Sequence, residues 1–460
     1  MGAIVAMTMA RLSALRIGDI VSFVRQQPVS FWGLNFYVFI EYVRPQSVYP
    51  ALNFLPWGKL SIIVTTLAWL AEGHRAKLRA PANPWLTAFT VIVLIGCFTA
   101  YIPGVAFQEV SLYLTWVLIY VLIVGIVNTE ERFLIFMLGF LVHSTKMSQH
   151  GVRTWASIGF GFQDWGATGG PGWFQNSGEF GIQMDVFFPL SAYFFLALYE
   201  HWGLIKRSLF FFMPVSAVVS MIASSSRGAL LGGAGAALWM VAKSKYRVRA
   251  FVGMGVVAFV VITSIPEKQL NRFKSSGTDN TSTLRLKYWQ DGIKITNDLP
   301  LTGVGFANWI PYYHRYYNPK GQVPHNIFIQ ASSETGYPGL LLFVGMIVVT
   351  WVSNAQTRRV VRRAKLEGKF IPLMAHALDA ALIGYLISGF FVTVLFYPYF
   401  WFNLAMTSAL FRVAQHAVRR STAARVVRSA ELVSGAQFML PKGVDLRPAA
   451  LRALPPMDAA

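Results

Sequence analysis

The sequence has little charge and almost no cysteine. Charged residues make up 13% of its 460 positions, whereas soluble domains carry roughly 25%. Cys97 is the single cysteine and lies in an apolar segment, which excludes an intramolecular disulfide, a cysteine-based zinc site and a thiol relay. The N-terminus lacks a clear cleavage site after a compact apolar core, so we predict no removed signal peptide. With 55% hydrophobic residues, the composition predicts a polytopic membrane protein.

Acidic residues are also scarce, because 20 Asp and Glu stand against 40 Lys and Arg, a formal net charge of +20. A charge of this size could indicate nucleic-acid binding. The basic residues, however, lie in short clusters between apolar runs, which is how topology signals are distributed in membrane proteins. We therefore predict contact with membrane lipid and no nucleic-acid partner.

Apolar segments long enough for helical spans recur along the chain, since a span needs about 20 apolar residues. Helices are the predicted spanning element because these runs are continuously apolar. The fold class is thus an all-α polytopic membrane protein with about twelve transmembrane helices. The predicted spans are 30–43, 57–71, 84–103, 110–127, 131–146, 179–199, 208–224, 228–242, 250–265, 337–354, 371–395 and 397–413.

The basic clusters predict the orientation, because short cytoplasmic connections are enriched in Lys and Arg. With the N-terminus inside, every short basic cluster falls on one side, and both termini are cytoplasmic. Four regions follow: spans one to nine in 1–265 with a Gly/Trp-rich outer loop at 147–178, a large periplasmic loop with short helices at 266–336, spans ten to twelve in 337–413, and a basic, disordered cytoplasmic tail at 414–460.

The first outer segment of interest, 151–181, is rich in glycine and tryptophan. Tryptophan stacks well on the apolar faces of sugar rings, and glycine lets the backbone approach a ligand closely. Arg153 in this segment is a candidate substrate-binding residue. The alternative is an interfacial aromatic belt with turns, and the sequence leaves both interpretations open.

The second segment is the turn Ser224–Gly228 between two apolar runs, which carries Arg227. A guanidinium presents a fork that matches phosphate oxygens, and serine hydroxyls and free amides at a helix start add donors. The alternative is an arginine that extends to lipid headgroups.

The third segment joins 283–289 to the turn Pro300–Phe306. If 283–289 is helical, Arg285 and Trp289 share a face at four-residue spacing, and Lys287 lies between them in the sequence. Taken alone, this stretch is typical of a solvated loop helix with ordinary charges.

The fourth segment begins at His325, which follows a proline and opens a predicted helix with Asn326. A histidine titrates near neutrality, which suits a general base. Glu334 further along could orient a partner or hold a positive charge, or could cap the Glu-Thr-Gly turn instead. His314, followed by Arg315, is the rival base.

Three acids lie in apolar surroundings: Glu41, Asp185 and Asp379. Intramembrane acids are functional candidates by default. For Asp185 and Asp379 we favour a structural role in which each pairs with an arginine inside the bundle.

Together these four outer segments resemble the O-antigen ligase and O-antigen polymerase superfamily of bacterial envelope proteins. Each motif is weak alone, but their order over about 200–360 is specific, and 151–181 further resembles a branch of O-glycosylation ligases. The matching motifs are Ser-Arg-Gly at Ser226–Gly228, Arg-x-x-x-Trp at Arg285–Trp289, Pro-Leu-Thr-Gly-Val-Gly-Phe at Pro300–Phe306, Pro-His-Asn at Pro324–Asn326, and Glu-Thr-Gly at Glu334–Gly336.

The resemblance implies a metal-independent, inverting glycosyltransferase without a cofactor. It would move a glycan from undecaprenyl diphosphate to an acceptor hydroxyl at the periplasmic face of the bacterial inner membrane. Carried over by position, Arg227 and Arg285 would hold the diphosphate, and His325 would take the acceptor proton or position the hydroxyl. The candidate substrate-binding residues are Arg153, Lys287, Trp289, His314, Arg315, Asn326 and Glu334.

The acceptor stays open, as does the choice of class. A ligase would use lipid A core, a polymerase another lipid-linked repeat unit, and a protein-directed relative a Ser or Thr hydroxyl. A transporter or flippase of lipid-linked sugars predicts charged residues along a path through the bundle and internal repeats. Few intramembrane charges and no obvious repeat are present, which favours the enzyme. A small-anion carrier is a third hypothesis.

Overall fold

The structure is a computed structural model, and it describes residues 9–73, 78–161, 166–170, 172–264 and 280–437. All regular elements in this part are helical, which confirms the all-α prediction there. The helices of the first half are α1 (Met9–Ser13), α2 (Ile17–Arg25), α3 (Val29–Val43), α4 (Pro45–Val48), η1 (Pro50–Leu52), α5 (Trp57–Ala71), α6 (Asn83–Phe98), α7 (Pro103–Ile126), α8 (Glu130–Ser157), α9 (Ser177–Leu198) and η2 (Tyr199–His201). Those of the second half are α10 (Leu204–Ala223), α11 (Arg227–Lys243), α12 (Arg247–Ser264), α14 (Asn280–Asp298), α15 (Trp309–Tyr316), α16 (Ile327–Arg363), α17 (Phe370–Gly389) and α18 (Pro398–Gln437).

Every predicted span overlaps a helix, but fewer helices meet a strict criterion for crossing a membrane. Among the described residues, 5 helices are long and apolar enough by length and composition, and α5 and α6 are shorter apolar helices. The count of twelve spans therefore stays a prediction. The five are α7, α9 continued through η2, α10, α16 and α17.

Some boundaries differ from the prediction. The span predicted at 371–395 ends at Gly389, and an irregular segment follows to Tyr397. The apolar side chains of this segment are buried in the bundle, with Val394 and Leu395 both 0% exposed. Its composition therefore matches that of a helix, and composition alone does not separate a buried loop from a helix. At the other boundary, α18 continues to Gln437, so a helix occupies 414–437, where a disordered tail was predicted. The remainder of that tail and 265–279 of the large loop lie outside the described residues.

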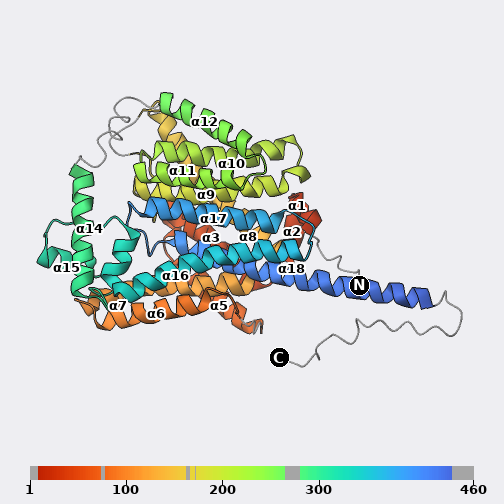
Figure 1. Cartoon of the computed structure of the whole chain (residues 1–460), viewed down its shortest axis with the longest axis horizontal. Coiled ribbons are helices and arrows are strands. Elements are labelled where there is room, and N and C mark those ends of the chain that lie inside the picture. The colour runs from red at the N-terminus through yellow and green to blue at the C-terminus, as the bar shows by residue number, and fades with distance from the viewer. Residues whose placement is uncertain (1–8, 74–77, 162–165, 171, 265–279, 438–460) are drawn as a thin grey trace.

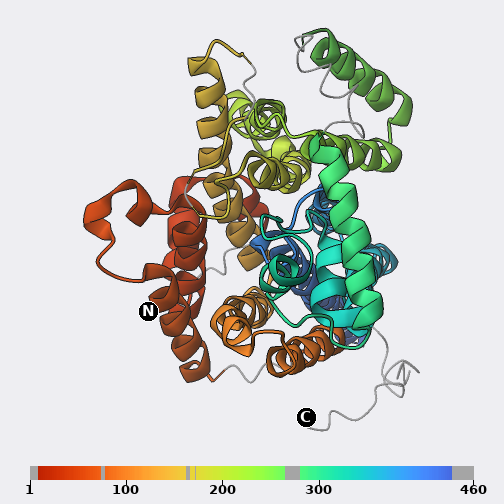
Figure 2. The same cartoon turned by 90° about the vertical axis from the view of Figure 1, so that its left-hand side faces the viewer.

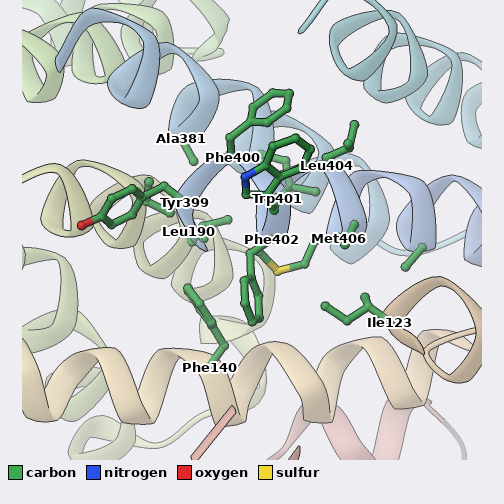
Figure 3. Close-up of a cluster of buried hydrophobic side chains, with 14 of the residues drawn as sticks. Ile123, Phe140, Leu190, Ala381, Tyr399, Phe400, Trp401, Phe402, Leu404 and Met406 are labelled. Carbon is green, nitrogen blue, oxygen red and sulfur yellow. The ribbon is translucent and has the colours of Figure 1, made fainter. Parts of the chain in front are cut away.

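The centre of the bundle is built by aromatic and aliphatic side chains from several helices. Figure 3 shows Phe400, Trp401 and Phe402 of α18 facing residues of α7, α8, α9 and α17. The rings of Phe140 and Phe402 lie 6.2 Å apart, and both side chains are 1% exposed. Because lipid tails are as apolar as these side chains, close packing rather than the hydrophobic effect holds such helices together.

Two helices depart from the direction of the bundle. In Figure 1 the bundle helices run roughly horizontally, whereas α14 stands across their left-hand ends with α15 beside it. Figure 2 views this end directly and shows α14 crossing in front of the bundle. We call it the loop end, and it carries α14, α15 and the starts of α9, α11, α16 and α18. The helices α1 and α2 lie at the opposite end.

The two buried aspartates have different partners. Asp379 of α17 forms an ion pair with Arg358 of α16 at 2.6 Å and accepts a hydrogen bond from the Asn354 side chain at 2.9 Å. The predicted pairing of Asp379 with an arginine is therefore confirmed. Asp185 of α9 instead contacts the hydroxyl of Ser388. The arginine predicted for Asp185 is wrong, because uncharged residues of α11 and α17 pack tightly against its carboxyl group.

Candidate functional site

The turn Pro300–Phe306 is fastened to a kink in α16. Gly336 has a φ of 67°, a conformation that glycine adopts without steric cost, and it interrupts the helix. The Tyr337 amide donates to the Pro300 carbonyl at 2.8 Å, and the Val304 amide to the Ser333 carbonyl at 2.8 Å. A Cβ at Gly336 would lie 2.5 Å from the Leu301 carbonyl carbon. Backbone hydrogen bonds thus join the motif Pro300–Phe306 to the motif Glu334–Gly336, and we call this arrangement the backbone clasp.

Glu334 lies inside this clasp and is only 4% exposed. Its carboxyl group accepts hydrogen bonds from the backbone amides of Ala307 and Trp309, at the start of α15. Amides at a helix start have no partner within the helix, so a side-chain acceptor there stabilises the helix whether or not it is ionised. This position favours a role for Glu334 in holding α15 against α16, so its predicted contact with substrate stays a prediction.

The helix α14 turns one face inward and one outward. Tyr288 and Ile295 are buried, and Thr296 donates to the Ser332 hydroxyl of α16 at 3.0 Å. Lys287 lies on the exposed face. The indole of Trp289 donates to the Pro324 carbonyl at 3.0 Å, which ties α14 to the segment that precedes His325.

His325 is held in a left-handed backbone conformation, with a φ of 49°, at the entrance to α16. Its amide donates to the Thr393 hydroxyl at 2.6 Å, and its Nε2 lies 3.3 Å from the Gln322 side-chain oxygen. Burial, followed by the nearby charge of Arg285, lowers the pKa of His325 from 6.5 to about 4. The imidazole is therefore neutral at neutral pH and lies close to Arg285.

Asn326 starts α16 by capping it. Its side-chain oxygen accepts hydrogen bonds from the amides of Phe328 at 2.8 Å and Ile329 at 3.1 Å. Asparagine is a preferred residue at this position because it satisfies amides that have no partner within the helix. Asn326 is 2% exposed and, by capping α16, fixes the backbone that follows His325. Its predicted contact with substrate stays a prediction.

The start of α11 presents Arg227 at the same end of the bundle. Ser225 has a φ of 52°, and the Ser226 side chain caps the helix by accepting from the Ala229 amide at 3.3 Å. A Cβ at Gly228 would lie 3.2 Å from Cβ of Phe391. The first turn of α11 therefore rests directly on the irregular segment after α17.

That segment, Phe390–Thr393, connects the parts of the site, and it was missed from the sequence. The Trp289 ring lies 5.1 Å from Phe390 and 6.4 Å from Phe391, and Thr393 holds His325. It therefore contacts the helices that carry Arg227 and Arg285 as well as His325 itself. Gly389 and Pro398 bracket the region and are the available sequence signal, because both residues commonly mark helix boundaries.

Comparison with known proteins matches the part of the chain that carries these three residues. Residues 211–344 match the family model for O-antigen ligase, a stretch that includes Arg227, Arg285 and His325. The resemblance to the O-antigen ligase and polymerase superfamily is confirmed. The exopolysaccharide production protein ExoQ of Rhizobium meliloti (strain 1021) is 38% identical over 84 residues, which cover 16% of this chain and 19% of ExoQ. The chain thus aligns with about a fifth of this relative.

His314 and Arg315 lie within the O-antigen ligase match, but the structure gives them other contacts than those of His325. His314 Nε2 lies 2.7 Å from the Gly321 carbonyl oxygen, across the turn that follows α15. Arg315 is exposed. His314 thus helps to close a turn. His325, by contrast, donates its amide to Thr393 and lies near the charge of Arg285.

Arg153 precedes the O-antigen ligase match and lies exposed on α8, where its Nε donates to the Gln149 carbonyl at 3.4 Å. Trp173, from the same Gly/Trp-rich segment, is brought inward. Its indole donates to Glu41, and its ring lies 4.8 Å from the ring of Tyr397. The segment therefore reaches the loop end through Trp173, while binding of substrate by Arg153 stays a prediction.

Proposed function

We propose that this chain is a membrane glycosyltransferase of the O-antigen ligase and polymerase type. It transfers a glycan from undecaprenyl diphosphate to an acceptor hydroxyl at the periplasmic face of the inner membrane. The observation that supports it best is the convergence of α11, α14 and the entrance of α16 on Phe390–Thr393. Three motif residues distant in sequence, Arg227, Arg285 and His325, are thereby grouped at one end of the bundle.

The two arginines suit a diphosphate leaving group. When the glycosidic bond to the diphosphate breaks, negative charge grows on the leaving phosphate oxygens. Fixed guanidinium groups aimed at those oxygens stabilise this charge, and they do so most strongly where water is excluded. Arg227 at a helix start adds free amides and the helix dipole to the same task.

His325 acquires its role when the donor binds. In the free protein its pKa is about 4, partly because Arg285 lies nearby, so the imidazole alone is a weak base. A bound diphosphate offsets the charge of Arg285 and favours the imidazolium, which raises the pKa of His325 towards neutrality. The neutral Nε2 can then accept the proton of the acceptor hydroxyl as the new bond to the sugar forms.

The acceptor distinguishes two forms of this proposal. A ligase would pass the glycan to lipid A core, or in a protein-directed form to a Ser or Thr hydroxyl. In a second form another lipid-linked repeat unit is the acceptor, as an exopolysaccharide polymerase would need, and the relative ExoQ is named an exopolysaccharide production protein.

The glycan profile of a deletion strain tests the proposal. The strain is complemented with wild type, Arg285→Ala, His325→Ala or Lys294→Ala, the last being a matched control on the exposed face of α14. We expect the control to restore the profile and the other two variants to fail at normal protein levels. In the deletion strain, full-length polymer on the lipid carrier with bare acceptor indicates a ligase, and single repeat units on a normal acceptor indicate a polymerase. Normal transfer by both Arg285→Ala and His325→Ala would overturn the proposed enzyme, and an unchanged profile in the deletion strain itself would favour the transporter hypothesis.

A further inference from the structure

Asp185 is a completely buried acid that the proposed chemistry does not use. It lies on α9 at 0% exposure, and its Oδ1 has no hydrogen-bond partner among the described residues. Small residues surround it closely. A Cβ built at Gly232 would lie 2.5 Å from Asp185 Oδ2, and a Cβ built at Gly384 of α17 would lie 3.2 Å from the Cβ of Asp185. Three helices, α9, α11 and α17, thus meet around this carboxyl group.

The hydrogen bonds around Ser388 indicate how Asp185 is held. The Ser388 hydroxyl contacts Asp185 Oδ2 and also lies 3.0 Å from the Gly228 carbonyl oxygen of α11. A hydroxyl has one proton, and a carbonyl oxygen can only accept. Both contacts are hydrogen bonds at the same time only if Ser388 donates to Gly228 and Asp185 carries a proton that it donates to Ser388.

The surroundings of Asp185 agree with a neutral acid. The groups that pack against it include Gly232 and Gly233 of α11 and Gly384 and Ser388 of α17, all of them uncharged. An ionised carboxylate in such surroundings costs several kcal/mol unless a cation compensates it. Asp379 shows the contrasting arrangement, with Arg358 at 2.6 Å.

The Asp185–Ser388 pair lies next to two elements of the loop end. Gly228 adjoins Arg227 in the first turn of α11, and Ser388 lies at the end of α17 just before Phe390–Thr393. Thr393 in turn holds the amide of His325. The Asp185–Ser388 pair therefore links the helix start that carries Arg227 to the segment that positions His325.

We propose that Asp185 is a positioning residue, held as a neutral acid, whose hydrogen bond through Ser388 sets the spacing between Arg227 and His325. Its effect on transfer rests on the proposed function, whereas its protonation does not. Displacing a reacting group by about 1 Å can lower a rate about 100-fold, so the spacing should act mainly on kcat.

Infrared spectroscopy tests the neutral acid independently of activity. The full-length protein in lipid nanodiscs is compared with Asp185→Asn at neutral pH. We expect the wild type to show the carbonyl stretch of a protonated carboxylic acid that the variant lacks. Asp379→Asn is the matched control and should remove a carboxylate band instead. A carboxylate band lost on Asp185→Asn would overturn the neutral acid.

Transfer kinetics test the positioning role with three variants. Asp185→Asn keeps a donor to Ser388 and should transfer within about threefold of wild type, whereas Asp185→Leu and Ser388→Ala should lower kcat about 10-fold or more with little change in KM for the donor. Ser388→Ala changes least volume and covers the case in which the leucine variant does not fold.

The outcomes separate the two proposals. Wild-type kcat in folded Ser388→Ala would overturn the positioning role, and so would an Asp185→Asn variant as impaired as the leucine variant. If the wild type itself transfers no glycan, the proposed function fails, and the infrared result still decides whether Asp185 is a neutral acid.

Discussion

The two ends of the bundle use their charged residues differently. At the end opposite α14, cations are bound by the protein itself: Arg358 pairs with Asp379, Lys369 with Glu200, and Arg132 donates to Gln27 at 2.8 Å. At the loop end, the contacts that join elements come largely from neutral groups, such as Thr393, Asn326 and Trp289. Arg358 and Arg132 thus stabilise the fold at one end, while at the loop end neutral hydrogen bonds join several of the elements that carry Arg227, Arg285 and His325.

We expect the largest effect from Arg285→Ala, which tests whether an arginine at the loop end serves transfer rather than stability. Because Arg285 is proposed to stabilise the leaving diphosphate, we expect glycan transfer to fall about 100-fold or more, with little change in thermal stability. Transfer from a purified lipid-linked donor and a melting curve measure both. An equal loss of stability and transfer would assign Arg285 the structural role of Arg358.

Asp379→Asn probes the opposite end. It leaves Arg358 without its carboxylate inside the bundle, and breaking a buried ion pair in this way costs about 3 kcal/mol or more. We expect a lower unfolding temperature and normal kcat in the fraction that remains folded. A variant as stable as wild type would mean that Arg358 reaches solvent or lipid headgroups once Asp379 is neutral.

His325 predicts a pH dependence at the loop end. Its pKa is about 4 in the folded protein and 6.5 for an ordinary histidine, so the unfolded chain binds more protons between these values. Its contribution therefore makes stability rise with pH across this window and level off above it. His325→Gln should flatten that part of a melting-temperature profile. An unchanged profile would show that His325 is not buried beside Arg285.

The smallest expected effect comes from Asn326→Ala. Loss of an N-cap typically costs about 1 kcal/mol, because two amides at the start of α16 lose their acceptor. We expect a small drop in unfolding temperature together with a measurable loss of kcat, since His325 is the preceding residue. Asn326→Ser should restore both, as serine also caps helices well. Failure of the serine variant would favour direct contact between Asn326 and substrate.

Much of this arrangement could be predicted from the sequence. The helix α5 begins and ends where the predicted span does, and α3 differs from its span by one residue at the start. The sequence motifs also point to Arg227, Arg285 and His325 as candidate catalytic residues, and this role stays a prediction. Apolar runs, prolines and glycines report on a helix locally, so such features are readable without the fold.

Other features depended on the tertiary structure. The sequence did not show that Phe390–Thr393 leaves the helix and contacts α11, α14 and the entrance to α16, because a buried loop and a helix share the same apolar composition. Only the structure shows that Glu334 faces the start of α15, and its contact with substrate stays a prediction. Asp185 was expected to pair with an arginine, but it contacts Ser388, which lies 203 residues further along the chain.

The amino-acid sequence by itself therefore determined the helical class, the apolar elements and the set of candidate cations, because each depends on residues close together in the chain. Only the tertiary structure decided which polar groups hold one another and which are grouped at the loop end. That choice depends on packing between distant helices, where the partner of a buried carboxyl group is whichever side chain the neighbouring helix presents.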